Sequence, residues 1–248
     1  MSPSVAWRSW FVSRVGGLAS LTMPTEPLKA SAPRWKRLAR QLLPARVQEH
    51  LLELRELSGA ERRAHVATTL RRLLIGRGAT IPLSLGPSDV VVFVCHGNII
   101  RSALAEALMR RHGTAAGVSF DRIVSAGLAA RPGREADPRA VAAARALGVD
   151  LAAHRAQPFT AELAERASVI FVMDRLNEAR LLARFPQASA KLRRLGALAA
   201  TEEGDVIADP YVLDAAAVAA VANRIDRATN AIVREIARRA RANAVGTP

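Results

Sequence analysis

A short run of β-branched and aromatic residues constrains the fold of this chain most. Val90–Val94 has the length of one buried strand and leads directly into a loop that contains Gly97 and Asn98. Apolar residues at helical spacing then run from Ala103 to His112, and Gly113 is placed to end the helix. A strand that passes straight into a helix is typical of a β-α-β unit. We therefore expect an α/β fold.

The alternation of strand and helix patterns continues to the end of the chain. Further strands are expected at Ile123–Val124 and Val169–Met173, and Lys191–Ala197 fits a fourth strand or an extended segment. Helices are expected at Asp137–Leu147, with Pro138 in the first turn, at Asn177–Phe185, and over a closing apolar stripe from Val218 to Ile236. The pattern predicts a small parallel sheet of about four strands, flanked by helices on both faces.

Three segments differ in composition. Residues 1–33 contain Pro, Ser and Gly without a sustained period, and we expect them to be disordered. Residues 34–85 have apolar positions at helical spacing, and Ser58 followed by Glu61 fits a capping box, so we expect a basic helical extension. Residues 88–248 carry the strand and helix alternation and form the predicted α/β domain.

The formal net charge of +14 is carried mostly by residues 1–85. Such a charge can attract nucleic acid, but all basic residues except Lys29, Lys36 and Lys191 are Arg in a chain also rich in Ala. We read this as a compositional bias and do not expect nucleic-acid binding. The basic extension could dock on an acidic partner. The alternative interpretation is a helical hairpin that packs on its own domain.

A single cysteine, Cys95, excludes a disulfide within the chain and a zinc site built from several cysteines. It suits a reducing compartment. The apolar runs are too short to cross a bilayer, so we expect no transmembrane segment. These observations predict a cytoplasmic protein.

The segment from Cys95 to Ser102 lies between the first strand and the first helix. A loop at this position can turn its N–H groups inward at a helix N-terminus and bind an anion. Arg101 can bind two phosphate oxygens with its planar guanidinium. The surrounding dipoles and Arg101 favour Cys95 as a thiolate, to which Ser102 can donate a hydrogen bond. We therefore expect a nucleophilic cysteine in a phosphate-binding loop.

At these residues the sequence resembles the low-molecular-weight protein tyrosine phosphatases. The family signature is a strand running into Cys-x-Gly-Asn-x-Cys-Arg-Ser, and an Asp-Pro-Tyr motif near the C-terminus is matched by Asp209-Pro210-Tyr211. The resemblance also covers shorter stretches of the same domain: Ser125-Ala126-Gly127, Ala136–Ala140, Gly148–His154 and Met173-Asp174.

The resemblance implies a role for each matching residue. Cys95 attacks phosphorus to form a phosphocysteine, Arg101 binds the phosphate, and Asp209 acts as general acid and then general base. Ser125 and His154 support the loop asparagine, and Tyr211 forms a wall of the substrate cleft. No metal or cofactor is implied. The expected substrate is a phosphotyrosine protein or a small phosphomonoester. The remaining residues of the implied phosphate-binding loop are His96, Gly97, Asn98, Ile99, Ile100 and Ser102.

The sequence departs from the family pattern around the expected cleft. Leu128–Arg131 lack the aromatic residue that often forms one wall, which leaves the preference for phosphotyrosine open. Ile99 argues against the arginine-phosphate branch, which has Thr there. An arsenate reductase would need further cysteines beside Cys95. The other alternative is a catalytically weak phosphate-binding or regulatory module of the same fold.

The second loop cysteine of the family is replaced by Ile100, so the disulfide that protects the nucleophile during oxidation cannot form. We predict that peroxide carries Cys95 further along the oxidation series, and that the oxidation reverses less easily than it would with a second cysteine. Activity measured after peroxide treatment and then after a mild thiol tests this. Full recovery of activity would contradict the prediction.

Overall fold

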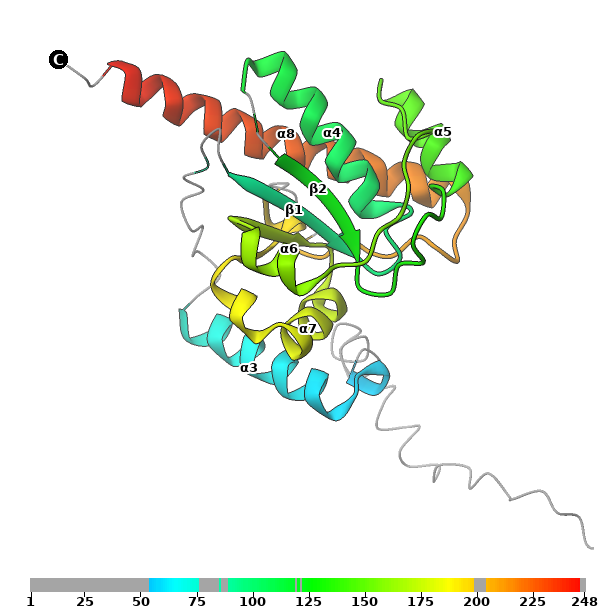
Figure 1. The fold of residues 1–248 in the computed structure, drawn as a ribbon, viewed down its shortest axis with the longest axis vertical. Coiled ribbons are helices and arrows are strands. Elements are labelled where there is room, and N and C mark those ends of the chain that lie inside the picture. Colours follow the sequence, from blue (N-terminus) through cyan, green and yellow to red (C-terminus); the bar gives the residue numbers. More distant parts are fainter. Residues whose placement is uncertain are drawn as a thin grey trace, which may run out of the picture. The chain divides into compact units, whose positions relative to one another are not determined.

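The parallel sheet that the sequence predicts lies between two layers of helices (Figure 1). The computed structural model describes residues 54–75, 85, 89–118, 120, 122–198 and 204–245, all within the unit Glu49–Pro248. The strand order is β2-β1-β3-β4, and every neighbouring pair is parallel. The strands are β1 (Val90–Cys95), β2 (Arg122–Gly127), β3 (Val169–Val172) and β4 (Leu192–Arg194).

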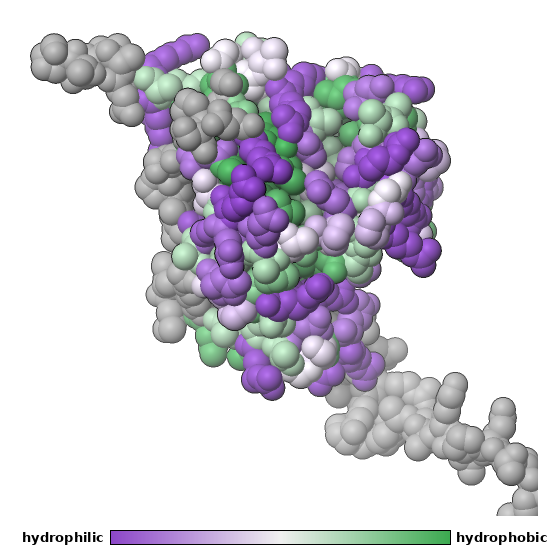
Figure 2. Space-filling model, viewed as in Figure 1, coloured by the Kyte–Doolittle hydropathy of each residue, from purple (hydrophilic) through white to green (hydrophobic). Residues whose placement is uncertain are grey.

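Helices cover both faces of the sheet, as predicted (Figure 1). One face carries α4 (Arg101–Ala116), α5 (Pro138–Ala146) and α8 (Ala215–Val245). The other face carries α6 (Ala161–Arg166) and α7 (Arg175–Arg184), and α3 (Gly59–Ile75) packs on α7. In the view of Figure 2 the surface of the described residues is mainly hydrophilic, with smaller apolar areas between the polar side chains.

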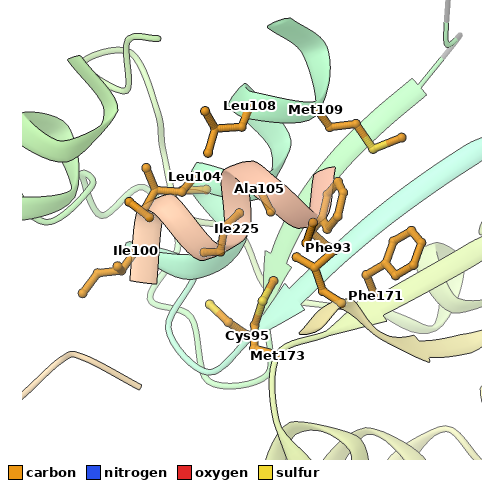
Figure 3. Close-up of a cluster of buried hydrophobic side chains, with 14 of the residues drawn as sticks. Phe93, Cys95, Ile100, Leu104, Ala105, Leu108, Met109, Phe171, Met173 and Ile225 are labelled. Carbon is orange, nitrogen blue, oxygen red and sulfur yellow. The ribbon is translucent and has the colours of Figure 1, made fainter. Parts of the chain in front are cut away.

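The two apolar layers follow from the alternation of side chains along the strands. In β1, Val91 and Phe93 point towards α4 and α8, whereas Val92 and Val94 belong to the layer under α6 and α7. Phe93 stacks on Phe171 of β3 with 5.4 Å between ring centroids, and both lie in the cluster of Figure 3. Both faces of the central strands are buried, which explains their continuous apolar sequence.

Two boundaries differ from the sequence expectation. Gly113 does not end the first helix, because it lies inside α4, where a Cβ would come within 2.9 Å of the Val118 carbonyl oxygen. The helix ends instead at Gly117, which has the left-handed φ of 66°. The second strand extends to Gly127, because pairing with β1 outweighs the low strand propensity of Ser125-Ala126-Gly127.

The sequence patterns did not predict the shortest elements correctly. Helix α6 has too few residues to show a clear period, although Thr160 caps it by accepting a hydrogen bond from the Leu163 N–H. The fourth strand is confined to Leu192–Arg194 and passes into a 3₁₀ turn, Leu195–Leu198. The predicted Asp137 start of α5 is confirmed, since its side chain accepts from the Arg139 N–H and Pro138 opens the helix.

Helix α3 is the described part of the predicted basic extension. Ser58 and Glu61 form the expected reciprocal capping bonds, with the Ser58 N–H donating to Glu61 at 2.7 Å. This hydrogen bond holds the pKa of Glu61 below its usual range. Arg180 of α7 pairs with Glu56 and Glu61. Residues 54–56, at the end of the first predicted helix of the extension, are helical, whereas residues 1–53 lie outside the described residues. No helix within the described ranges is long and apolar enough to cross a membrane.

Leu57 lies two residues before the start of α3 and is 2% exposed, whereas Leu70 within α3 is 54% exposed, so the two leucines test the packing of this segment. We expect Leu57→Ala to lower the free energy of unfolding by about 2–5 kcal/mol, through lost burial and a residual cavity. The matched control Leu70→Ala should change it by less than about 0.5 kcal/mol. Urea denaturation measures both. Equal effects of the two substitutions would contradict this packing.

Candidate active site

Cys95 ends β1 at the carboxyl edge of the sheet, between β2 and β3. The chain leaves β1 towards β2 on one side and later returns to β3 on the other, so this edge is a topological switch point. Cys95 Sγ lies 3.0 Å from Ser102 Oγ and accepts a hydrogen bond from the Asn98 N–H at 3.2 Å. Both contacts suit a sulfur atom that carries negative charge.

Asn98 fixes the conformation of the loop after Cys95. It is fully buried and has a φ of 54°, the only positive φ of a non-glycine among the described residues. Its Nδ2 donates to Ser102 Oγ at 2.9 Å and to Ser125 Oγ at 3.0 Å. His154 Nε2 donates to its carbonyl oxygen at 2.7 Å. The structure therefore places Ser125 and His154 against Asn98, as the sequence analysis expected.

Gln157 also contacts this loop and was missed by the sequence analysis. Its backbone N–H donates to Asn98 Oδ1 at 2.9 Å, and its side chain donates to the Ser125 carbonyl oxygen. A glutamine in a loop gives no sequence signal for such a role. The side chains of Asn98 and Ser102 are buried and do not line the pocket, so they contribute to the shape of the loop.

Arg101 is the largest buried polar side chain near Cys95 and is 2% exposed. Its Nη1 donates to Asp174 Oδ2 at 2.6 Å and to the Ile207 carbonyl oxygen at 3.1 Å, and its Nη2 donates to Asp209 Oδ2. Burial alone would lower the pKa of Arg101, but Asp174, Cys95 and Asp209 outweigh it and raise the pKa above its usual value. The guanidinium is therefore a permanent positive charge beneath the loop.

Asp174 has two structural tasks. It caps α7 by accepting the Asn177 N–H at 2.6 Å, and it orients Arg101 through the second carboxylate oxygen. The sequence analysis noted Met173-Asp174 only as part of the resemblance. An Asp before a helix predicts a helix cap. No sequence pattern predicts that the same carboxylate also contacts an arginine that is distant in the sequence.

A single open pocket of about 530 Å³ brings the predicted residues together. Cys95, Arg101 and Asp209 all line it, and the side chain of Asp209 is 44% exposed. Tyr211 forms part of the wall and is half exposed. The other lining residues are His96, Gly97, Ile99, Ile100, Ala129, Arg131 and Arg134.

The start of α5 joins the loop after Cys95 to the loop that carries Asp209. The Asp137 N–H donates to the Ile99 carbonyl oxygen at 2.9 Å. Arg139 donates to Asp137 and also to the carbonyl oxygens of Tyr211 and Leu213. The hydrogen bond from Arg139 holds the pKa of Asp137 below its usual range. No sequence pattern predicts this link.

The described residues contain no group of three His, Cys, Asp or Glu side chains placed to hold a metal ion. The site combines a buried cysteine at the end of a parallel strand, a loop that leads into a helix N-terminus, and an arginine and an aspartate in the same pocket. Together they define the class of cysteine-dependent phosphatases.

Comparison with known proteins identifies the family. The family model described as low molecular weight phosphotyrosine protein phosphatase matches residues 90–242. A Ralstonia nicotianae protein described as "probable low molecular weight protein-tyrosine-phosphatase EpsP" is 38% identical over 146 residues, which is 59% of this chain and 94% of that protein. The chain belongs to the low-molecular-weight protein tyrosine phosphatase family and is a cysteine-dependent enzyme.

Other relatives include both tyrosine and arginine phosphatases by name. The tyrosine phosphatase Wzb of Escherichia coli K30, solved with sulphate, has a TM-score of 0.54 and 28% identity, and the match covers 60% of this chain and 99% of that one. A protein-arginine-phosphatase of Bacillus subtilis is 32% identical, covering 49% of this chain and 79% of that protein. The degree of identity therefore does not separate the two substrate types.

Gly127 tests whether the position of the loop after Cys95 matters. A Cβ on Gly127 would lie 2.7 Å from the His96 carbonyl oxygen and 2.9 Å from the Asn98 nitrogen. We expect Gly127→Ala to displace the loop and to lower kcat/KM for p-nitrophenyl phosphate by about 10²-fold. Gly59→Ala, whose nearest contact is an ordinary 3.9 Å, is the control. Unchanged kinetics in a folded Gly127→Ala protein would refute the prediction.

Proposed function

We propose that this phosphatase hydrolyses phosphotyrosine in proteins through a phosphocysteine intermediate on Cys95. The observation that carries the proposal is the convergence of Cys95, Arg101 and Asp209 on one pocket. The Cys95 sulfur is the nucleophile, the Arg101 guanidinium provides a fixed positive charge, and the exposed Asp209 carboxyl group donates a proton.

The phosphate is bound by the loop amides and by Arg101. The Ile100 side chain offers no capping hydrogen bond to the start of α4, so the first N–H groups of the helix are free of side-chain acceptors. Asp174 holds Arg101 through Nη1, which leaves Nη2 to exchange Asp209 for a phosphate oxygen. Binding of phosphate therefore releases Asp209 from the guanidinium.

The first chemical step transfers the phosphoryl group to sulfur. The Cys95 thiolate donates an electron pair to phosphorus, the bond from phosphorus to the tyrosine oxygen breaks, and that oxygen takes a proton from Asp209. Arg101 and the amides stabilise the charge on the equatorial oxygens.

The second step regenerates the enzyme. Asp209, now a carboxylate, takes a proton from water as the water oxygen attacks phosphorus. The bond from phosphorus to sulfur breaks, inorganic phosphate leaves, and Cys95 returns as the thiolate, which Ser102 and the Asn98 N–H stabilise.

The pocket wall favours tyrosine over arginine as the phosphorylated residue. Ile99 lines the pocket at the position where the resembling arginine phosphatases have Thr, and Tyr211 adds an aromatic face. An apolar wall can contact a flat phenyl ring, whereas a guanidinium needs polar partners. Arginine phosphate is the competing substrate class, since a relative of that name is similar in sequence.

Substitution of the proposed catalytic residues tests this mechanism. We expect Cys95→Ser to remove hydrolysis of p-nitrophenyl phosphate and of a phosphotyrosine peptide, because the hydroxyl is a much weaker nucleophile. Asp209→Ala should lower kcat on the peptide by about 10²–10⁴-fold through loss of acid and base catalysis. Acid-quenched samples of the wild type should contain phosphocysteine, detected by mass spectrometry.

Two outcomes would count against different parts of the proposal. A wild type no faster than Cys95→Ser on both substrates would contradict the enzymatic mechanism. A wild type with a higher kcat/KM on a phosphoarginine peptide than on the matched phosphotyrosine peptide would leave the mechanism intact and overturn the substrate assignment.

A further inference from the structure

We propose that Arg131 and Arg134 form a basic rim that selects substrates with acidic residues next to the phosphorylated residue. This inference rests on the proposed function and extends it from the phosphorylated side chain to its neighbours in the peptide. Both arginines line the pocket that contains Cys95, and both are exposed.

The pocket carries more arginine side chains than the phosphate-binding loop itself contains. Its lining holds three arginines and one carboxylate, Asp209. Arg101 is buried beneath the loop and serves the phosphate, together with the loop amides. The basic rim is exposed at the pocket surface instead, so its charge can meet a second anionic group of the substrate.

The acidic residues closest in sequence to the basic rim are engaged by other arginines. Glu135 pairs with Arg155 at 3.3 Å, and both carboxylate oxygens of Asp137 accept from Arg139. Within the described residues, neither Arg131 nor Arg134 has an ion-pair partner within 4.0 Å. The Arg134 guanidinium lies 5.9 Å from the Tyr211 ring centroid, which holds it beside the substrate wall.

The backbone that carries the basic rim is fixed in place. The Arg134 N–H donates to the Arg131 carbonyl oxygen at 3.2 Å, which closes the turn between them. The Gly133 N–H donates to the Ala156 carbonyl oxygen at 2.9 Å, and the Ala156 N–H donates to the Arg134 carbonyl oxygen at 2.8 Å. The backbone at both arginines is therefore ordered before the substrate binds, so binding has only the side-chain rotamers left to fix.

An acidic peptide is the partner that fits these features. Residues on either side of a phosphorylated tyrosine stay at the pocket mouth when the ring enters, and carboxylates there can reach exposed guanidinium groups. Leu128–Arg131 contain no aromatic side chain, so this side of the pocket recognises charge rather than a ring. Electrostatic complementarity of this kind acts mainly on the association rate and falls with added salt.

A matched peptide series tests the basic rim. The peptides contain one phosphotyrosine flanked by Asp and Glu, by Asn and Gln, or by Lys, and each protein is characterised by its own ratio of kcat/KM for the acidic and the amide peptide. We expect a wild-type ratio of about 10 at low salt, falling towards 1 at about 300 mM salt. The double substitution Arg131→Gln and Arg134→Gln should bring the low-salt ratio close to 1.

Arg145→Gln is the control, because Arg145 is exposed in the last turn of α5 and does not line the pocket. It removes one positive charge and should leave the ratio at the wild-type value. Replacement of both rim arginines by Lys should restore most of the ratio, since the charge is kept. A wild-type ratio near 1, or an equal loss in Arg145→Gln, would overturn the proposal. Failure of the wild type on every peptide would instead count against the proposed function.

Discussion

The conformation of Asn98 is the constraint on which the site depends. A buried non-glycine residue in the left-handed region raises the free energy of the folded state. Hydrogen bonds compensate for this cost, because Asn98 Nδ2 donates two while its Oδ1 and its carbonyl oxygen each accept one. Those bonds connect the loop to β2 and to the segment around His154. The same turn aims the Asn98 N–H at the Cys95 sulfur. The left-handed conformation of Asn98 therefore also positions the hydrogen bond that the nucleophile accepts.

A second constraint is the burial of Arg101. A guanidinium that is 2% exposed needs several partners, and these come from two separate parts of the chain: Asp174 after β3, and the segment before α8 that holds Ile207 and Asp209. The charge therefore holds together segments that the sheet alone would not join. Because one of these partners is also the proposed acid, phosphate binding and the release of the acid are coupled through a single side chain.

The sequence predicted the fold, and the place of Cys95 at the end of the first strand, because both depend on local patterns. The apolar run Val90–Val94 and the loop that follows it place Cys95, and Asp209-Pro210-Tyr211 stands just before the last helix. Contacts between distant residues left no such pattern. The contacts of Asp174 and Arg139 arise from tertiary packing, and so does the close approach of Val118 and Phe120 to Gly113 inside α4. The roles of Asp209, Tyr211, Ser125 and His154 were predicted only through the family resemblance.

The packing of α3 on α7 sets the boundary of the folded unit. The family match begins at residue 90, yet Leu57 is buried well before it, and Arg180 takes its acidic partners from the same early segment. A chain trimmed to the matched residues would present the covered side of α7 to water, and newly uncovered apolar surface promotes self-association. A shortened form of this phosphatase that keeps α7 covered therefore has to include residues before the family domain.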